Sequence, residues 1–267
     1  MRAFRIAYDG TPYAGFQRQP DVSTVEDTIF DALRRLEVFD GTKPPGYAAA
    51  GRTDAGVSAL AQTIALDAPA WLTPRAMNSE LPATIRAWAA ADAPEDFHAR
   101  HHATEREYTY HCYAPAEAID DDRLETALET LTGSHDVHNL TPDDWNTERT
   151  LSLEAAREGA YLVFTVRSGG FCRELVRRLV SLVHAVATSD VSLERLERVL
   201  APSPLPSGEG IAPAPPEPLV LTAVTYPDLT FELDDEAATI ARDLFERQRV
   251  ERTTSARVSQ TICTGLE

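Results

Sequence analysis

Lysine is almost absent from this sequence of 267 residues. Lys43 is the one lysine, against 24 arginines, and the 25 basic residues face 42 acidic residues, so the formal net charge is −17. A large negative charge keeps a protein dispersed where concentrated salt screens repulsion to a few ångströms. We therefore expect adaptation to a salty cytoplasm. A genome rich in G and C, which also favours arginine over lysine, is the alternative explanation.

Cysteines and long apolar runs are also scarce. Cys112, Cys172 and Cys263 are scattered, odd in number and without ligand spacing, which argues against a disulfide framework and a zinc site. No apolar run reaches the roughly 18 residues that a membrane span needs. The N-terminus, "MRAFRIAYDG", alternates like a strand and does not resemble a signal peptide. We expect a cytoplasmic protein without a membrane partner.

The overall acidity alone would argue against a nucleic-acid partner, but the local charge decides RNA binding. Residues 1–110 are the least acidic part, with 11 basic and 15 acidic side chains. Seven of its ten arginines are spread through the segment as candidates: Arg5, Arg18, Arg52, Arg75, Arg86, Arg100 and Arg106. The sequence thus permits a basic cleft in an acidic body.

Periodicity predicts a mixture of strands and helices. Alternating apolar residues predict strands in 4–10, 61–68, 85–94, 105–114, 160–170 and 219–227. Helical spacing predicts helices in 25–36, 73–82, 121–133, 171–187, 192–201 and 234–251, and Ser23 with Glu26 has the spacing of a capping box before the first. The proline-rich segment 202–218 is expected to be irregular.

The order of these elements favours an α+β protein. The helices do not alternate strictly with the strands, so two α/β halves on a mixed, largely antiparallel sheet fit better than a doubly wound parallel sheet. We expect an N-terminal lobe in 1–104, a C-terminal lobe in 105–228 and a helical tail in 229–267.

The stretch "AGRTDAG" is the first candidate for a functional loop. Gly51 and Gly56 would allow its backbone to approach a ligand and to adopt positive φ. Asp54 would then be an exposed carboxylate that Arg52 could keep ionised or complement at a phosphate. Taken alone, the aspartate fits better with an Asx-turn on its own backbone.

Three further groups are candidates. His98, His101 and His102 could bind metal, but they lack a metalloprotease pattern, so RNA contacts or plain exposure fit better. Tyr108 shares one face of its strand with Tyr110, either as core or as a platform for a flipped base. Arg173, placed in the first turn of the helix at 171–187, would pair with Glu174 or Glu154, or with Asp54.

Four segments together resemble the tRNA pseudouridine synthase A family. They are "YDGTPYAGFQRQP", "AGRTDAGVSALAQ", "NSELP" with "DFHARHHATEREYTY", and "GGFCRELVRRLV", in the family's order and at similar spacings. "AGRTDAG" is close to diagnostic by itself. The strand "LVLTAVTYP" resembles the family's last strand, so the resemblance covers residues 2–228.

The resemblance implies a fold, a reaction and a set of site residues. It implies the two-lobed pseudouridine synthase fold with a cleft between the lobes, acting as a homodimer. It also implies isomerisation of uridine to pseudouridine at positions 38–40 of the tRNA anticodon stem-loop, without metal or cofactor. Asp54 matches the catalytic aspartate, Arg173 its salt-bridge partner and Tyr108 the tyrosine that stacks on the uracil and is a candidate for the final proton removal. Arg52 matches the residue that fills the gap left by the flipped nucleotide, and Arg18 and Gln17 would lie along the RNA path.

Some positions depart from the family pattern. Phe16 stands where many members have tryptophan, and Ser58 where bacterial members often have histidine. These differences bear on substrate choice and not on the reaction.

A non-catalytic tRNA-binding protein and a histidine-dependent metal hydrolase are the alternative functions. The intact Asp54, Tyr108 and Arg173 argue against the first.

Overall fold

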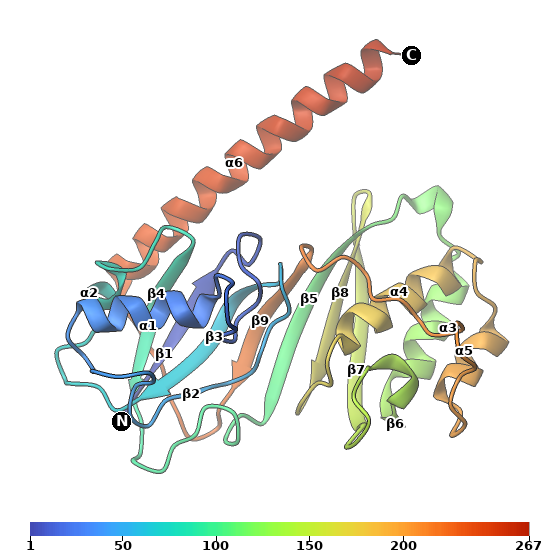
Figure 1. Ribbon diagram of the computed structural model, residues 1–267. Helices are drawn as coiled ribbons and strands as arrows, with labels where there is room; N and C mark the ends of the chain where they lie inside the picture. The colour runs from blue at the N-terminus through green and yellow to red at the C-terminus, as the bar shows by residue number, and fades with distance from the viewer. Residues whose placement is uncertain (267) are drawn as a thin grey trace.

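A single β-sheet runs through the whole molecule in the computed structural model, which describes residues 1–266 (Figure 1). Its strands in this range are β1 (Arg2–Tyr8), β2 (Ala48–Ala49), β3 (Ser58–Leu66), β4 (Ile85–Asp92), β5 (Glu105–Tyr113), β6 (Gly133–Asp136), β7 (Glu148–Glu158), β8 (Tyr161–Ser168), β9 (Leu219–Thr225) and β10 (Glu232–Leu233). The order across the sheet is β10-β4-β1-β3-β9-β5-β8-β7-β6, and β2 pairs with β3.

Strand β9 joins the two halves of the sheet. It comes late in the chain but lies between β3, to which it is parallel, and β5, to which it is antiparallel. Every other strand pair in the described chain is antiparallel. The expected α+β class with a mixed, largely antiparallel sheet is therefore confirmed. The division into lobes at residue 104 stays a prediction, because one sheet continues across it.

Helices accompany both halves of the sheet (Figure 1). The N-terminal half carries α1 (Val25–Arg35) and α2 (Pro74–Asn78), and the C-terminal half carries α3 (Asp121–Leu131), α4 (Leu175–Ala187) and α5 (Leu193–Leu200). The apolar stripe of α1, which includes Ile29 and Leu33, is fully buried with Phe4 and Ile6 of β1. Removing such stripes from water is the main favourable term in folding.

The starts of two helices differ in detail from the prediction, although α1 begins at Val25 as expected. Thr24 caps α1, because its Oγ1 accepts a hydrogen bond from Asp27 N at 3.2 Å, so the expected box of Ser23 and Glu26 is shifted by one residue. Helix α4 begins at Leu175 and not at Phe171, because Glu174 has a left-handed backbone with φ of 59°. Arg173 therefore lies before the helix.

The last helix, α6 (Asp235–Gly265), is longer than expected and leaves the body. Its first turns pack on β4 and α2, where Ala237 and Ala241 are buried. Beyond them it extends past the rest of the molecule as a single helix (Figure 1). No helix in residues 1–266 is both long and apolar enough to cross a bilayer.

Candidate active site

The loop that carries Asp54 connects β2 to β3 near the middle of the sheet. Polar contacts fix the residues before the aspartate, and after it Gly56 N donates to Tyr13 O at 3.3 Å. Thr53 Oγ1 lies 2.8 Å from the hydroxyl of Tyr8, which is buried in β1, and Gln62 Nε2 donates to Gly51 O at 3.0 Å. A loop tied at each end to strands holds its central residue in one place.

Glycines let this loop lie against the turn that follows β1. Gly56 has φ of +81°, as expected for the loop. Gly51 does not have a positive φ, and a Cβ there would meet no atom within 4 Å. A Cβ on Gly10 would stand 2.0 Å from Val57 O, so only glycine permits this approach. The turn at Asp9–Gly10 and the Asp54 loop therefore form one packed unit.

The side chain of Asp54 pairs with Arg177, so the expected pairing with Arg173 is wrong. Arg177 Nη1 lies 3.2 Å from Asp54 Oδ2, with the arginine side chain 13% exposed and the aspartate 37%. Arg173 Nε instead lies 2.5 Å from Asp143 Oδ1, and Arg173 N donates to the same carboxylate. The cause is the late start of α4, which leaves Arg173 outside the helix and places Arg177 on its first turns.

The proline-rich segment 202–218 positions Arg177. Arg177 Nε donates to Ala214 O at 2.6 Å, and Ala214 N donates to Arg177 O at 3.1 Å. Pro216 lies against Gly56, two residues after Asp54 in the loop. An irregular segment thus bridges α4 and the Asp54 loop, a role that its composition does not reveal.

Tyr108 lies beside this ion pair on β5. The residue is 8% exposed, and its ring meets that of Phe171 edge to face at 5.1 Å between centroids. Burial raises the pKa of the Tyr108 hydroxyl well above its ordinary value, and the nearby negative charge of Asp54 raises it further. The phenol is therefore neutral at neutral pH and can donate a hydrogen bond.

Arg106, two residues before Tyr108, ties several parts of the site together. Its guanidinium donates to four backbone carbonyls, at Ala50, Ala103, Gly169 and Arg100, over 2.6–3.1 Å. Ala50 enters the Asp54 loop, and Gly169 enters the segment that leads to α4. Within residues 1–266 this arginine has no carboxylate partner, and burial lowers the pKa of its guanidinium.

The remaining arginines of residues 1–110 do not form a basic cleft together. Arg5 and Arg86 turn inward to backbone carbonyls, Arg75 pairs with Glu236, and Arg18 pairs with Asp27 on α1 at 2.5 Å. Arg52 is exposed on the Asp54 loop, and Gln17 is half-buried in the loop before α1.

The three neighbouring histidines make no metal centre. The rings of His98 and His101 lie 4.2 Å apart, and desolvation, followed by the charge of His101, lowers the pKa of His98. Over residues 1–266 no group of three or more histidine, cysteine or acidic side chains could hold an ion.

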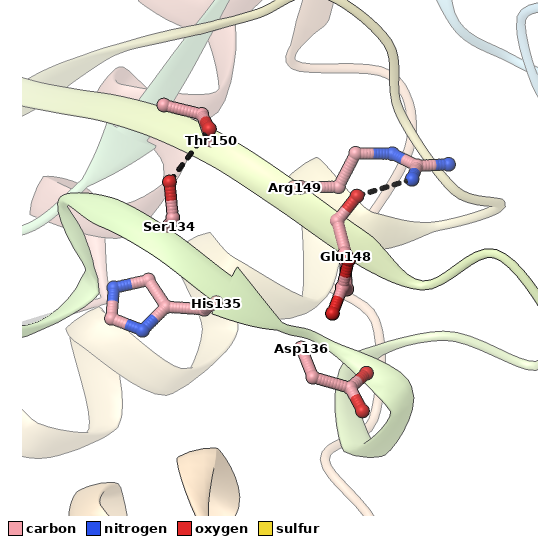
Figure 2. Close-up of a pocket in the computed structure, with 6 residues that line it drawn as sticks. All are labelled: Ser134, His135, Asp136, Glu148, Arg149 and Thr150. Carbon is pink, nitrogen blue, oxygen red and sulfur yellow. Dashed lines mark hydrogen bonds between the residues drawn. The ribbon is translucent and has the colours of Figure 1, made fainter.

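A surface hollow of about 430 Å³ lies on the β6–β7 hairpin, at the edge of the sheet (Figure 2). Ser134 and Thr150 face each other across the two strands at 2.8 Å, and His135 points away from them. Several strands separate the hollow from Asp54. Its lining residues include no ion pair beside a buried tyrosine like that of Asp54, Arg177 and Tyr108.

The fold and the Asp54 loop, taken with the motifs, place the chain in the class of the pseudouridine synthases. A family model described as tRNA pseudouridine synthase matches residues 127–227. "tRNA pseudouridine synthase A" of Haloarcula marismortui is 54% identical over all of both chains, and that of Halobacterium salinarum is 58% identical over 97% of each. The corresponding protein of Natronomonas pharaonis is 57% identical, again over 97% of each chain.

The chain belongs to the tRNA pseudouridine synthase A family. The recognition made from the motifs is therefore confirmed, and the relatives come from halophilic archaea, as the acidic composition suggests. Among solved structures, the chain is similar to one in a crystal structure of the archaeal box H/ACA sRNP Nop10-Cbf5 complex. That match has a TM-score of 0.38 and 14% identity over 70% of this chain and 44% of the other.

Proposed function

We propose that this protein isomerises uridine to pseudouridine in the anticodon stem-loop of tRNA, with Asp54 as its catalytic residue. The observation that carries the proposal is the Asp54 carboxylate, held by Arg177 beside the neutral Tyr108 hydroxyl on a loop tied to the sheet. The curated relatives are named for the same activity.

The reaction needs no co-reactant. The bond between C1′ of the ribose and N1 of the uracil breaks, the base rotates, and C5 forms a bond to C1′. The proton on C5 leaves and N1 gains one, so the atoms of the nucleotide are conserved. The residues must hold the free base in place and keep water away while neither bond is formed.

Asp54 assists this exchange in its ionised form. It acts as a nucleophile on the sugar or the base, or as the group that removes a proton from the sugar, and each route requires a free carboxylate. Arg177 supplies an opposite charge beside this carboxylate, with one guanidinium nitrogen on the carboxylate and another on Ala214 O. It takes the position that the motifs had assigned to Arg173.

Tyr108 stacks on the uracil and gives its hydroxyl as a hydrogen-bond donor. Because its pKa is raised, the phenol accepts the C5 proton only if it passes its own proton on, and Asp54 is the adjacent acceptor.

Arg52, exposed on the Asp54 loop, fills the space of the flipped nucleotide. Gln17 and Arg18 lie along the RNA path beyond it. The protein works as a homodimer in the cytoplasm.

The test of the function is Asp54→Asn. The variant removes the charge but little contact area, so pseudouridine formation should be abolished while tRNA binding stays within about tenfold. Mapping pseudouridine in tRNA after incubation measures the first, and a binding titration measures the second. Asp143→Asn, which removes the carboxylate paired with Arg173, is the matched control and should keep full activity. Substantial turnover by Asp54→Asn would contradict the assignment.

A further inference from the structure

We infer that the projecting half of α6, residues 247–266, is an arm that binds the sugar-phosphate backbone of the tRNA whose uridine enters the Asp54 site. The inference rests on the proposed function for the identity of the RNA. Three independent features of the arm point to a polyanionic partner: its charge, its position and its composition.

The charge along α6 is polarised. Residues 235–246, which pack on the body, contain four acidic residues and one arginine, whereas residues 247–266 contain four arginines and one glutamate. No acidic residue follows Glu251 in this arm, although the whole chain carries a net charge of −17. The arm is thus a basic element on an acidic protein, and RNA binding is governed by such local charge.

The arm begins beside the catalytic loop. Arg252 pairs with Asp9 at the end of β1, and the following Gly10 donates from its backbone to Ser58 Oγ at 3.0 Å. Asp9 itself is 8% exposed, so this contact fixes the base of the arm to the unit that holds Asp54. From Arg252 to Gly265 a helix rises about 20 Å, and the arm therefore reaches well beyond a single nucleotide.

The composition of the arm also points to a partner. Eight of the twelve residues 253–264 are threonine, serine, valine or isoleucine, which are weaker helix formers than alanine or leucine. All twelve are exposed, so the described chain gives this part of the helix no tertiary packing. A single helix of this kind is marginal in water, and a bound surface would stabilise it.

Arg247 and Arg257 are the arginines to test, because neither is among the ion pairs of residues 1–266. In the full chain, Arg247→Gln with Arg257→Gln should raise KM for tRNA about tenfold and leave kcat within about twofold, since only binding is lost. The slope of log affinity against log[KCl] should become less steep by about 1.4–1.8 for two lost phosphate contacts. The matched control, Arg35→Gln with Arg198→Gln, removes the same charge from exposed positions on α1 and α5 and should change neither.

The same affinities measured in the Asp54→Asn background separate the arm from the chemistry. Wild-type protein that binds tRNA through the arm but forms no pseudouridine would contradict the proposed function alone. If the arm variant is active and its KM and salt slope are unchanged, the proposed role of the arm in tRNA binding is overturned. A second measurement is the amide hydrogen exchange of residues 253–264, which should slow when tRNA binds. Exchange that slows with protein concentration and not with tRNA would overturn the inference in favour of self-association through Val250, Val258 and Ile262.

Discussion

Arg177 and Arg173 form a matched pair of side chains, because each holds one aspartate in the same part of the molecule. Arg177 faces Asp54 and Arg173 faces Asp143. We expect Arg177→Gln to lower kcat by about 100-fold, as removing a positioned charge from an active site typically does. Arg173→Gln should leave kcat within about threefold, since its partner is Asp143 and not Asp54. Single-turnover rates on tRNA measure both, and a larger loss from Arg173→Gln would restore the pairing that the motifs imply.

Arg106 offers a second test, because its four carbonyl contacts join the Asp54 loop to β5 and to the approach to α4. A lysine has too few donors to satisfy four carbonyls, so Arg106→Lys should lower the free energy of unfolding by about 2–4 kcal/mol. It should also lower kcat, since the loop loses its anchor. Urea unfolding and single-turnover rates measure the two effects.

Arg5 is the control for Arg106. It is half-buried and donates to Val224 O at 2.6 Å and to Thr63 Oγ1 at 2.7 Å, but to no residue of the Asp54 loop. Arg5→Lys should destabilise the fold by a similar amount and leave kcat of the folded protein unchanged. Equal losses of kcat in both variants would mean that Arg106 acts through stability alone.

At the level of single residues, the sequence predicts well that Gly56 and Asp54 lie on a functional loop. It predicts less well which residues they contact. Asp54 and Tyr108 were named from the motifs, and the structure brings them together. Arg177 was missed because Arg173 is the same residue type one helical turn earlier. The deciding feature is the left-handed backbone of Glu174, a conformation that a glutamate rarely adopts and so does not signal. Arg106 was expected among the arginines of a basic cleft, because the sequence does not reveal that its guanidinium turns to backbone carbonyls.

Among the elements, the end of α1 carries an avoidable strain. Val38 N donates to Leu33 O at 3.0 Å and Glu37 N to Arg34 O at 2.9 Å, the pattern of a Schellman motif, which usually has glycine at its left-handed position. Here that position is the exposed Glu37, with φ of 55°. Glu37→Gly should therefore raise the free energy of unfolding by about 0.5–1 kcal/mol, the left-handed cost less the entropy of glycine.

The control is Glu37→Ala, which removes the same charge from the helix C-terminus but keeps the Cβ. Its gain should be smaller, because charge at an exposed helix end contributes only about 0.3–1 kcal/mol at low salt and less in concentrated salt. Urea unfolding in molar KCl separates the two variants. If alanine stabilised as much as glycine, the charge and not the backbone would be the cause.

The elements that the sequence predicts well are those with an unbroken period. Strand β8 alternates cleanly between buried and half-buried residues, and α4 has its stripe of buried leucines and valines. The hairpin of β6 and β7 was missed, because β6 is short and polar and the later part of β7 is charged and exposed. β6 pairs with β7, and β7 pairs with β8 across a tight turn at residues 159–160, and local periodicity does not contain these pairings between strands.

Across the whole molecule, the candidate active site depends on contacts between distant parts of the chain. Asp54 precedes β3, Tyr108 lies on β5, Arg177 on α4, and the connector after α5 closes over them. The insertion of β9 between β3 and β5 sets the distance between the first two. The family resemblance could identify the parts, but their relative placement follows from long-range strand pairing that only the fold reveals.

The net charge of −17 leads to a prediction for the whole molecule. In dilute buffer the carboxylates repel one another over longer distances, whereas at molar salt the screening length falls to about 3 Å. The protein should therefore unfold at a much lower urea concentration in dilute buffer than in molar KCl. Glu125 and Glu129 stand four residues apart on the exposed face of α3, where like charges destabilise a helix. Glu125→Gln with Glu129→Gln should narrow the difference, by stabilising the protein in dilute buffer and changing little in KCl. Equal stability of the wild type in both solutions would mean that the acidic surface has no part in folding under salt.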